Sequence, residues 1–274
     1  VIDYIEANED GGTVVIDGLY KCHGIKVLKN NITLDGVGYA GLLYRNDGNS
    51  DWIVDVELNP SVNDRIFNID KLRIAGNTLA VTERGLKLQN MYGNSRIDVL
   101  FLGLQTCCFT GDVYGAQFNT TMRLYQLGFV GDSVKATNNN TFTCNFLDGT
   151  TTGNVADIKP IVPTGYSNNV FLNSIWEARG TVGPTDFSLS GGENKFIGCR
   201  FEQLNLAESD WLILGNRDKL LNCAFYQSTE WRAYSATTDF WCIRVPSVDC
   251  KIEGLMVESS YAGHLLKLDT TSSG

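Results

Sequence analysis

A short pattern of apolar and polar positions recurs through the second half of the chain. It reads "NTFTCNFLDG", "NVFLNSIWEA", "NKFIGCRFEQ", "DKLLNCAFYQ" and "CKIEGLMVES", and weaker copies occur upstream at "NNITLDGVG", "FNIDKLRIAGN", "SRIDVLFLG" and "TMRLYQLGFVG". The first large apolar residue of each clear copy is its anchor, and successive anchors lie 29, 25, 24 and 32 residues apart. A unit of about 25 residues indicates a repeat architecture. The anchors are Phe142, Phe171, Phe196, Leu220 and Ile252.

A second apolar residue follows each anchor five positions later. Successive side chains of a flat strand point to opposite faces, so residues five apart do not share a face. A bend between them returns both to one side. The phrase therefore predicts a strand, a tight bend and a second strand around a common core. The second apolar residues are Leu147, Trp176, Phe201, Phe225 and Val257.

Mostly small residues occupy the predicted bend, three positions after the anchor. Stacked at about 4.8 Å per coil, they form an internal ladder in which Asn and Ser satisfy buried backbone groups. Cysteine suits the same position as a small filler. We therefore expect most of the eight cysteines to be free, buried thiols, with a Cys199–Cys223 disulfide as the alternative. The predicted bend residues are Asn145, Ser174, Cys199, Cys223 and Leu255.

These features predict an all-β fold, a right-handed parallel β-helix with a short N-terminal capping helix. The unit is too short for a propeller blade, and it lacks the leucine spacing of a horseshoe repeat. About nine or ten coils are expected, in a rod roughly 45 Å long. Residues 1–29 are assigned to the capping helix, in "VIDYIEANEDGG", and to a leading strand. Residues 30–274 are assigned to the β-helix body of a fragment of a longer chain.

The acidity of the chain limits its partners. Its 274 residues carry a formal net charge of -9, and an acidic surface repels the phosphates of nucleic acid. No apolar run approaches the roughly 18–20 residues that span a bilayer, so membrane insertion is not expected. Two histidines and no C-x₂-C pair are present, so we expect no metal and no cofactor.

The residue after the second apolar position is acidic in four of the five phrases. Because its neighbour points inward, this residue points outward, and adjacent acids stack about 5 Å apart. Retaining glycosidases hold their two carboxyl groups about 5–5.5 Å apart, and inverting ones about 6.5–9.5 Å apart. Glu177, Glu202 and Asp148 are therefore the candidate catalytic residues. An ordinary solvated acidic face is the alternative.

Aromatic and charged residues gather in two insertions, "LAESDWLIL" and "YQSTEWRAYSATTDFWCIRV". Sugar rings pack on aromatic side chains, and carboxylates and guanidinium groups bind their polar substituents. Burial of the tryptophans in the core is the alternative. Together with the one aromatic member of the acidic series, the candidate substrate-binding residues are Trp231, Glu230, Arg232, Tyr234, Trp211 and Tyr226.

The beginning of the chain resembles a known family. A short amphipathic segment, then "GGTVVIDGLY", a lysine-containing strand and "NITLDGVG" resemble the start of pectate-lyase-like β-helices, especially phage tailspikes. The resemblance implies a homotrimeric virion fibre, attached to other virion tail proteins, that binds and often cleaves bacterial surface polysaccharide. It also implies a place in the virion tail, with secretion as the alternative. The N-T-D, D-D, G-H-G and R-I-K combination of polygalacturonases and the W-x-D-H and R-x-P-x-x-R signatures of pectate lyases are absent.

Three hypotheses about function follow. The first is a tailspike-like receptor-binding protein that recognises bacterial surface polysaccharide and, as an enzyme, is an endo-acting glycoside hydrolase with paired carboxylates. The second is a non-catalytic virion adhesin or structural fibre on the same fold. The third is a secreted bacterial polysaccharide lyase or epimerase, for which Arg232 or Arg244 offers the required cation without a surrounding motif.

Overall fold

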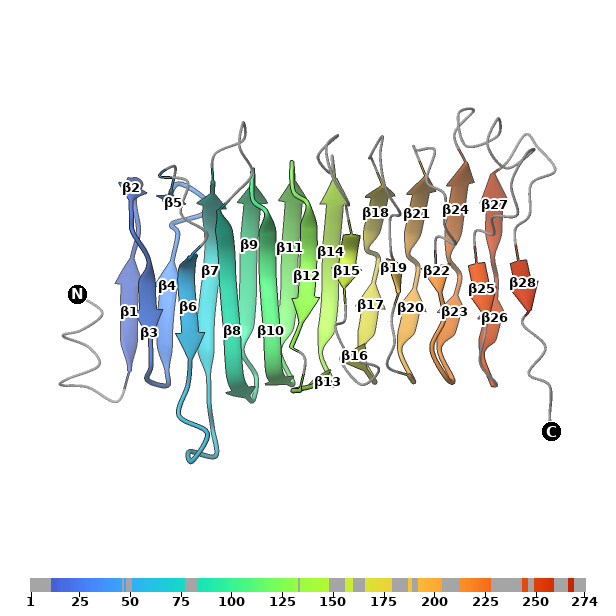
Figure 1. The fold of residues 1–274 in the computed structure, drawn as a ribbon, viewed down its shortest axis with the longest axis horizontal. Helices are drawn as coiled ribbons and strands as arrows, with labels where there is room; N and C mark the ends of the chain where they lie inside the picture. Colours follow the sequence, from blue (N-terminus) through green and yellow to red (C-terminus); the bar gives the residue numbers. More distant parts are fainter. Residues whose placement is uncertain are drawn as a thin grey trace.

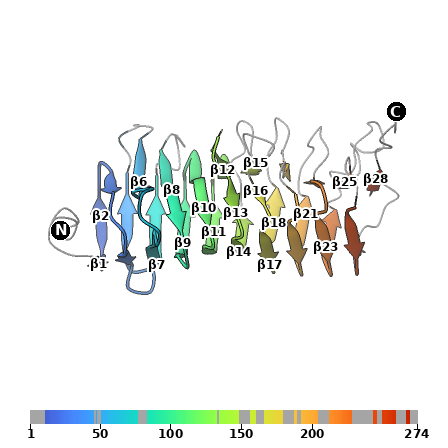
Figure 2. The same cartoon turned by 90° about the horizontal axis from the view of Figure 1, so that it is seen from below.

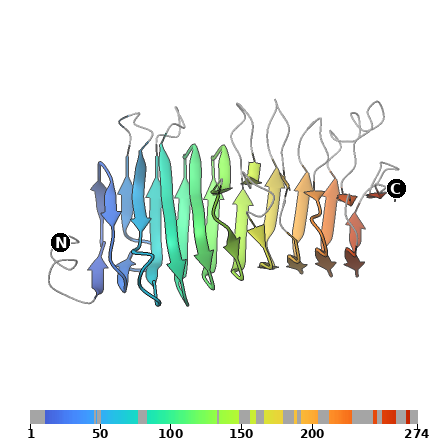
Figure 3. The same cartoon turned by 60° about the horizontal axis from the view of Figure 1, so that its bottom comes forward.

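Strand follows strand through the described part of the chain. The coils lie side by side along a rod, and the chain runs from one end to the other (Figure 1). In the turned views the coils keep this order (Figures 2 and 3). None of the described residues forms a helix long and apolar enough to cross a bilayer. The computed structural model describes residues 11–45, 47, 51–76, 83–132, 134–147, 156–159, 166–178, 187–188, 192–203, 212–227, 243–245, 249–258 and 266–268.

The largest sheet, sheet A, contains an unbroken row of ten parallel strands, one from each described coil. Shorter strands pair beside this row. They are β2 (Leu19–Lys21), β5 (Leu42–Tyr44), β18 (Ile175–Ala178), β21 (Arg200–Gln203), β24 (Ala224–Gln227) and β27 (Met256–Glu258). The row is β1 (Gly12–Val15), β4 (Ile32–Asp35), β7 (Phe67–Ala75), β9 (Arg96–Leu102), β11 (Gln117–Arg123), β14 (Thr141–Leu147), β17 (Val170–Leu172), β20 (Lys195–Ile197), β23 (Lys219–Leu221) and β26 (Lys251–Glu253).

Two further parallel sheets complete the coils. Sheet B contains β3 (Ile25–Val27), β6 (Trp52–Glu57), β8 (Arg84–Tyr92), β10 (Thr106–Tyr114), β12 (Leu127–Gly131), β13 (Thr137–Asn138), β15 (Ala156–Lys159) and β16 (Tyr166–Ser167). Sheet C contains β19 (Phe187–Ser188), β22 (Leu212–Ile213), β25 (Ile243–Val245) and β28 (Leu266–Leu268).

The predicted right-handed parallel β-helix is the fold of this chain. The strand register confirms the repeat residue by residue, because each predicted anchor is directly paired with the next. The paired anchors are Phe142, Phe171, Phe196, Leu220 and Ile252. The strands from Gly12 to Val27 already pair with the following coil. The predicted capping helix, within residues 1–10, lies outside the described residues.

Two predicted positions in the first phrase are wrong by one residue. Phe146, not Leu147, pairs with Trp176, and Cys144, not Asn145, is buried at the position of the bend ladder. The reason is local backbone geometry. β14 runs unbroken from Thr141 to Leu147, whereas each later coil inserts one residue with positive φ at the bend. These inserted residues are Asn173 (φ 46), Gly198 (φ 64), Asn222 (φ 53) and Gly254 (φ 65).

The small residues at the bend act as hydrogen-bond donors to the preceding coil. Ser174 Oγ donates to the carbonyl of Phe142 at 3.3 Å. Cys199 Sγ donates to the carbonyl of Phe171 at 3.3 Å, and Cys223 Sγ donates to that of Phe196 at 3.4 Å. The thiols therefore take the place of a serine hydroxyl, and all described cysteines are free, as predicted.

Two stacks of aromatic rings fill the core beneath sheet A. In one stack, Phe118, Phe142, Phe171 and Phe196 follow one another at centroid distances of 4.7, 4.8 and 4.9 Å. A second stack begins at Phe146 and continues through sheet positions after the bend, with centroid distances of 5.7, 4.7 and 4.5 Å. Its other members are Trp176, Phe201 and Phe225.

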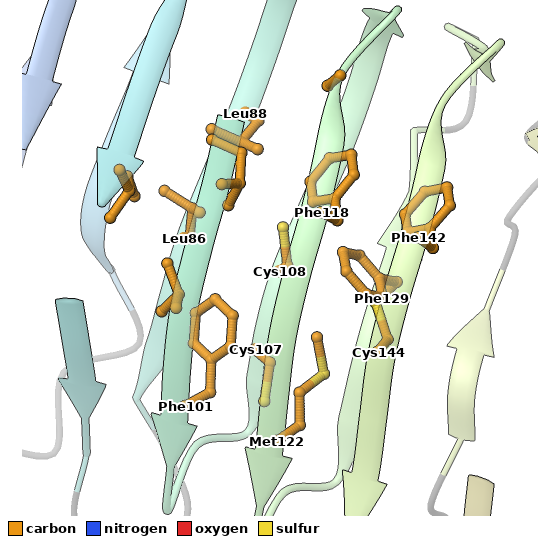
Figure 4. Close-up of a cluster of buried hydrophobic side chains, with 14 of the residues drawn as sticks. Leu86, Leu88, Phe101, Cys107, Cys108, Phe118, Met122, Phe129, Phe142 and Cys144 are labelled. Carbon is orange, nitrogen blue, oxygen red and sulfur yellow. The ribbon is translucent and has the colours of Figure 1, made fainter. Parts of the chain in front are cut away.

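Side chains from sheet B close the core from the other side. Phe129 of β12 meets Phe118 and Phe142 edge-on, at 5.4 and 5.3 Å between centroids (Figure 4). The buried Cys108 of β10 and Cys144 of β14 pack in the same cluster (Figure 4). The sheets are thus held together by apolar contacts within each coil and by ring stacking between coils.

A buried polar ladder holds the turns that lead into β11, β14, β17, β20 and β23. The backbone N–H groups of Ala116, Asn140, Asn169 and Asn194 each donate to the side-chain oxygen of the equivalent residue in the next coil, at 2.8–3.1 Å. The last acceptor is Asp218, whose second carboxyl oxygen accepts from Gly215 N at 2.7 Å. An amide-bearing or acidic side chain is needed here because water does not reach these backbone groups.

The aromatic stack yields a stability prediction. Phe196→Ala removes a fully buried ring and leaves a cavity, so we expect a loss of about 3–5 kcal/mol in the free energy of unfolding. Val134→Ala, at a side chain that is 85% exposed, should change it by less than about 0.5 kcal/mol. Urea unfolding measures both. Equal midpoints for the two variants would show that the stack contributes little.

Asp218 yields a pH prediction. Burial raises the pKa of its carboxyl from 3.8 to about 6, although hydrogen bonds from Asn194 and Gly215 lower it. Because the folded state holds this proton more tightly than the unfolded state, its contribution to stability is present below about pH 4 and is lost as the pH rises through about 6. Asp218→Asn removes this titration. Its melting temperature should therefore fall less than that of the wild type across this window, and parallel melting curves against pH would contradict the assignment.

Candidate functional site

The predicted carboxylate series lies in strands of sheet A, from β18 to β27. Glu177 pairs directly with Glu202, Glu202 with Tyr226, and Tyr226 with Glu258. The backbones of adjacent members are therefore separated by one coil, about 4.8 Å. For the three glutamates the structure describes the backbone register, and their side chains lie outside the described part.

Asp148 lies outside the described residues. Phe146 pairs with Trp176, so the residue after Phe146 that matches Glu177 is Leu147, the last residue of β14. Asp148 is therefore one residue further along the chain than the position that the repeat predicts.

Tyr226 is the one predicted substrate-binding residue that the structure describes. Its ring is half-buried, and the guanidinium carbon of Arg200 lies 4.5 Å from the ring centroid. Arg200 comes from the neighbouring coil, on the same outer face. A cation and an aromatic ring are thus placed together beside the glutamate series. The other candidates, Trp231, Glu230, Arg232, Tyr234 and Trp211, lie outside the described residues.

A second set of carboxylates, which the repeat did not predict, lies on sheet A nearer the N-terminus. Asp35 of β4 pairs directly with Asp70 of β7. Asp98 of β9 follows in the next coil, beside an irregularity in the register of β7. Asp35 and Asp70 are half-buried, whereas Asp98 is only 2% exposed. Three acids thus lie on three successive coils, and the direct pairing of Asp35 with Asp70 separates their backbones by about 4.8 Å.

Hydrogen bonds within the protein stabilise the carboxylates of two of these three acids, Asp98 and Asp35. Asp98 accepts a hydrogen bond from the hydroxyl of Tyr39, and Arg96 donates to its other oxygen at 3.5 Å. Asp35 accepts from the backbone N–H of Val37 at 2.8 Å. The buried Oδ1 of Asp70 has no hydrogen-bond partner among the residues that the structure describes. Of the three acids, Asp70 is therefore the one whose position is least explained by hydrogen bonds within the protein.

The loop between β4 and β5 places Tyr39 over this group. Val37, Gly38 and Tyr39 have φ values of 49°, 68° and 73°, so three consecutive residues adopt left-handed backbone geometry. Such a run is costly for a β-branched residue such as Val37 and persists where surrounding contacts hold it. Here Tyr39 N donates to the carbonyl of Lys71 at 2.7 Å. Burial, followed by the hydrogen bond and charge of Asp98, raises the pKa of the Tyr39 hydroxyl, which therefore remains a donor.

A polar hollow continues from this group along sheet A. It has a volume of about 310 Å³, and its polar lining comes from β9, β11 and β14. These side chains offer both hydrogen-bond donors and acceptors, which suits hydroxyl-rich ligands. The polar lining residues are Arg96, Gln117, Asn119, Thr141 and Thr143.

Aromatic side chains also reach the surface of sheet B. Trp52 and Phe109 lie 5.9 Å apart between centroids, and Arg84 lies over the Trp52 ring at 5.7 Å. Tyr92 and Tyr114 form a second pair at 5.1 Å. Sheet B is thus the competing surface for a ligand with flat apolar faces.

Across the described ranges, no group of three or more His, Cys, Asp or Glu side chains is arranged to hold a metal ion. Asp35, Asp70 and Asp98 lie in strands of three successive coils. Carboxyl groups in such a row can transfer protons, attack an electrophilic carbon and accept hydrogen bonds.

The sequence did contain a signal for the Asp35, Asp70 and Asp98 group. The upstream copies "ITLD", "FNID" and "SRID" each end in an acid after an inward apolar residue. The intervals between these acids are 35 and 28 residues, which differ from the tight spacings of 24 and 25 downstream. Insertions in the first coils therefore hid the regular spacing of these three acids.

The comparison with solved structures supports the architecture. No protein-family model matches the chain, and no curated protein matches it. A similar solved structure is the DFA-IIIase from Arthrobacter chlorophenolicus A6 without its lid, with 9% identity, a TM-score of 0.52, and coverage of 96% of this chain and 82% of that one. What this shows is the fold.

Two other solved structures are similar at lower scores. ORF18 of Geobacillus virus E2 has 17% identity and a TM-score of 0.49, with coverage of 94% of this chain and 54% of that one. The A-module of the Azotobacter vinelandii mannuronan C-5 epimerase AlgE6 has 10% identity and a TM-score of 0.42, with coverage of 95% and 94%. The chain thus spans about half the length of the phage protein.

The contact between Tyr39 and Asp98 yields a prediction. Tyr39→Phe leaves a buried carboxylate without its hydroxyl donor, so we expect it to lower the free energy of unfolding by about 1–3 kcal/mol. In combination with Asp98→Asn, the two losses should be non-additive by about 0.5–3 kcal/mol, measured by urea unfolding.

Tyr20→Phe is the matched control, because Tyr20 also donates to an aspartate, Asp17, but at an exposed site. It should change the free energy of unfolding by less than about 0.5 kcal/mol. Additive effects of Tyr39→Phe and Asp98→Asn would mean that this hydrogen bond does not hold the loop.

Proposed function

We propose that the protein binds a bacterial surface polysaccharide along the outer face of sheet A and hydrolyses it with Glu177 and Glu202, in the manner of a tailspike-like receptor-binding protein. The observation that supports this most is the direct pairing of Glu177 with Glu202 on adjacent coils. It separates their backbones by about 4.8 Å, close to the 5–5.5 Å between the carboxyl groups of retaining glycosidases.

The form of the face suits a polymer. Its columns of outward side chains run along the rod, and the polar hollow of β9, β11 and β14 lies on the same sheet as the glutamates. Arg200 and Tyr226 add a cation and a ring beside the predicted pair. An extended sugar chain can therefore contact several coils at once, and many weak contacts add to a useful affinity.

A retaining mechanism follows from this spacing. In the first step one carboxylate attacks the anomeric carbon, while the other, as a carboxylic acid, gives its proton to the departing glycosidic oxygen. In the second step that group takes a proton from water, and the water oxygen displaces the first carboxylate. Both groups return to their starting protonation states.

The resemblance of the chain's beginning to phage tailspikes supports the biological setting of the proposal. In that setting the protein is a homotrimer in the virion tail, bound to other tail proteins and acting outside the cell on the bacterial surface. Secretion by a bacterium is the alternative setting. The Asp35–Asp70 pair is the second candidate for the catalytic pair, because it shows the same direct pairing one coil apart.

A screen with matched variants tests the proposal. The protein is incubated with a panel of purified capsular polysaccharides and O-antigens, and binding and new reducing ends are measured. Glu177→Gln and Glu202→Gln should each lower the rate of hydrolysis by a factor of about 10² to 10⁴, while binding is retained. Glu253→Gln, at an exposed acid of β26 that pairs with Lys251, is the control and should hydrolyse normally.

Each other outcome has a defined meaning. Full activity of both glutamine variants, with loss in Asp35→Asn and Asp70→Asn, moves the site to the first coils. An unsaturated product identifies a lyase instead. Stable binding of a polysaccharide without any product supports the non-catalytic adhesin, and the hydrolase proposal then fails.

A further inference from the structure

A column of lysines lies on the outer face of sheet A beside the glutamate series. Lys195 of β20 pairs directly with Lys219 of β23, and Lys219 pairs with Lys251 of β26. Adjacent members are about 4.8 Å apart along the backbone. Like charges at directly paired positions destabilise a sheet, so such a column requires an explanation.

The three lysines differ in how their charges are balanced. Lys251 is 58% exposed and forms an ion pair with Glu253 on its own strand. Lys195 and Lys219 are half-buried, and neither has an ion pair or hydrogen bond from its ammonium group to another described residue. The two more buried lysines are thus the two whose ammonium groups have no partner in the described part of the chain, which favours an anion from outside the chain.

The same two lysines line a hollow of about 370 Å³. The turn that precedes each strand forms its rim, with Glu193 and Arg217 in an ion pair at 2.9 Å. Asn168 and Asp249 lie on the same rim. The ion pair with Arg217 neutralises Glu193, so Lys195, Lys219 and Asp249 carry the remaining charges of the lining, two positive and one negative.

We propose that this hollow, the Lys195–Lys219 groove, binds the anionic substituents of the polysaccharide, so that the ligand is an acidic polysaccharide bearing carboxylate or phosphate groups. This inference rests on the proposed function and names its substrate class. Lys195 and Glu202 belong to the same coil, on either side of the bend at Gly198 and Cys199. A sugar chain along the rod therefore places its anionic groups on the lysines and its backbone beside the glutamates.

A nucleic acid carries anions too, but its backbone is charged at every residue. The chain's net charge of -9 opposes such a ligand over most of the surface. A polysaccharide with anionic groups only on some of its sugars meets the two lysines and leaves the acidic columns in contact with neutral sugars. The charge distribution therefore favours the polysaccharide.

Binding of three polymers tests the proposal. The full chain is titrated with polygalacturonate as the carboxylate probe, inorganic polyphosphate as the phosphate probe and dextran as the neutral probe. We expect one or both anionic polymers to bind, with a Kd that rises with salt. Lys195→Gln with Lys219→Gln should raise that Kd by about ten-fold or more, because charge-assisted hydrogen bonds are lost.

Lys251→Gln is the matched control, since its charge is already paired, and it should change the Kd by less than about two-fold. Thermal unfolding of all variants confirms that they are folded. An equal loss of affinity in Lys251→Gln would show that the attraction is non-specific, and it would overturn the proposal that the Lys195–Lys219 groove is the binding site. Binding of dextran alone, or of neither anionic polymer, also overturns it. If a neutral polysaccharide from the panel is hydrolysed by Glu177 and Glu202, the proposed function stands and only this inference fails.

Discussion

The backbone ladder between coils, with its rise of about 4.8 Å, is the constraint on which the rest of the structure depends. It places each residue directly above the equivalent residue of the preceding coil. The interior must therefore be built from side chains that pack well against identical or similar side chains in the neighbouring coils. Phenylalanine does so with ring centroids 4.7–4.9 Å apart. Asparagine does so by accepting a backbone hydrogen bond from one coil while its own N–H donates to the next.

The same constraint acts on the outer face, where stacking is costly for like charges. The chain relieves that cost at some positions by placing opposite charges in contact, as in Glu193 with Arg217 and Lys251 with Glu253. At Lys195 and Lys219, and at Asp35 and Asp70, like charges are paired directly, and the described residues include no ion pair to these side chains. These two pairs, both candidate functional groups, are thus positions of the outer face where like charges lie next to one another.

The sequence predicted the interior better than the surface, for physical reasons. Inward residues must be large and apolar in every coil, so the anchors from Phe142 to Ile252 could be aligned to the residue. The error at Leu147 arose because one backbone residue with positive φ, present at Asn173 and Gly198, is missing from β14. The Asp35, Asp70 and Asp98 group escaped notice because its intervals include insertions, and its contact with Tyr39 depends on a loop conformation that no periodicity encodes.

Both proposals place the ligand on the outer face of sheet A. Acetylation of lysine amines, quantified by mass spectrometry with and without the bound polymer, tests this placement most directly. Lys195 and Lys219 should become protected in the complex, while Lys26 and Lys87, on sheet B, should react as in the free protein. Protection of Lys26 and Lys87 with unchanged labelling of Lys195 and Lys219 would instead place the ligand on sheet B.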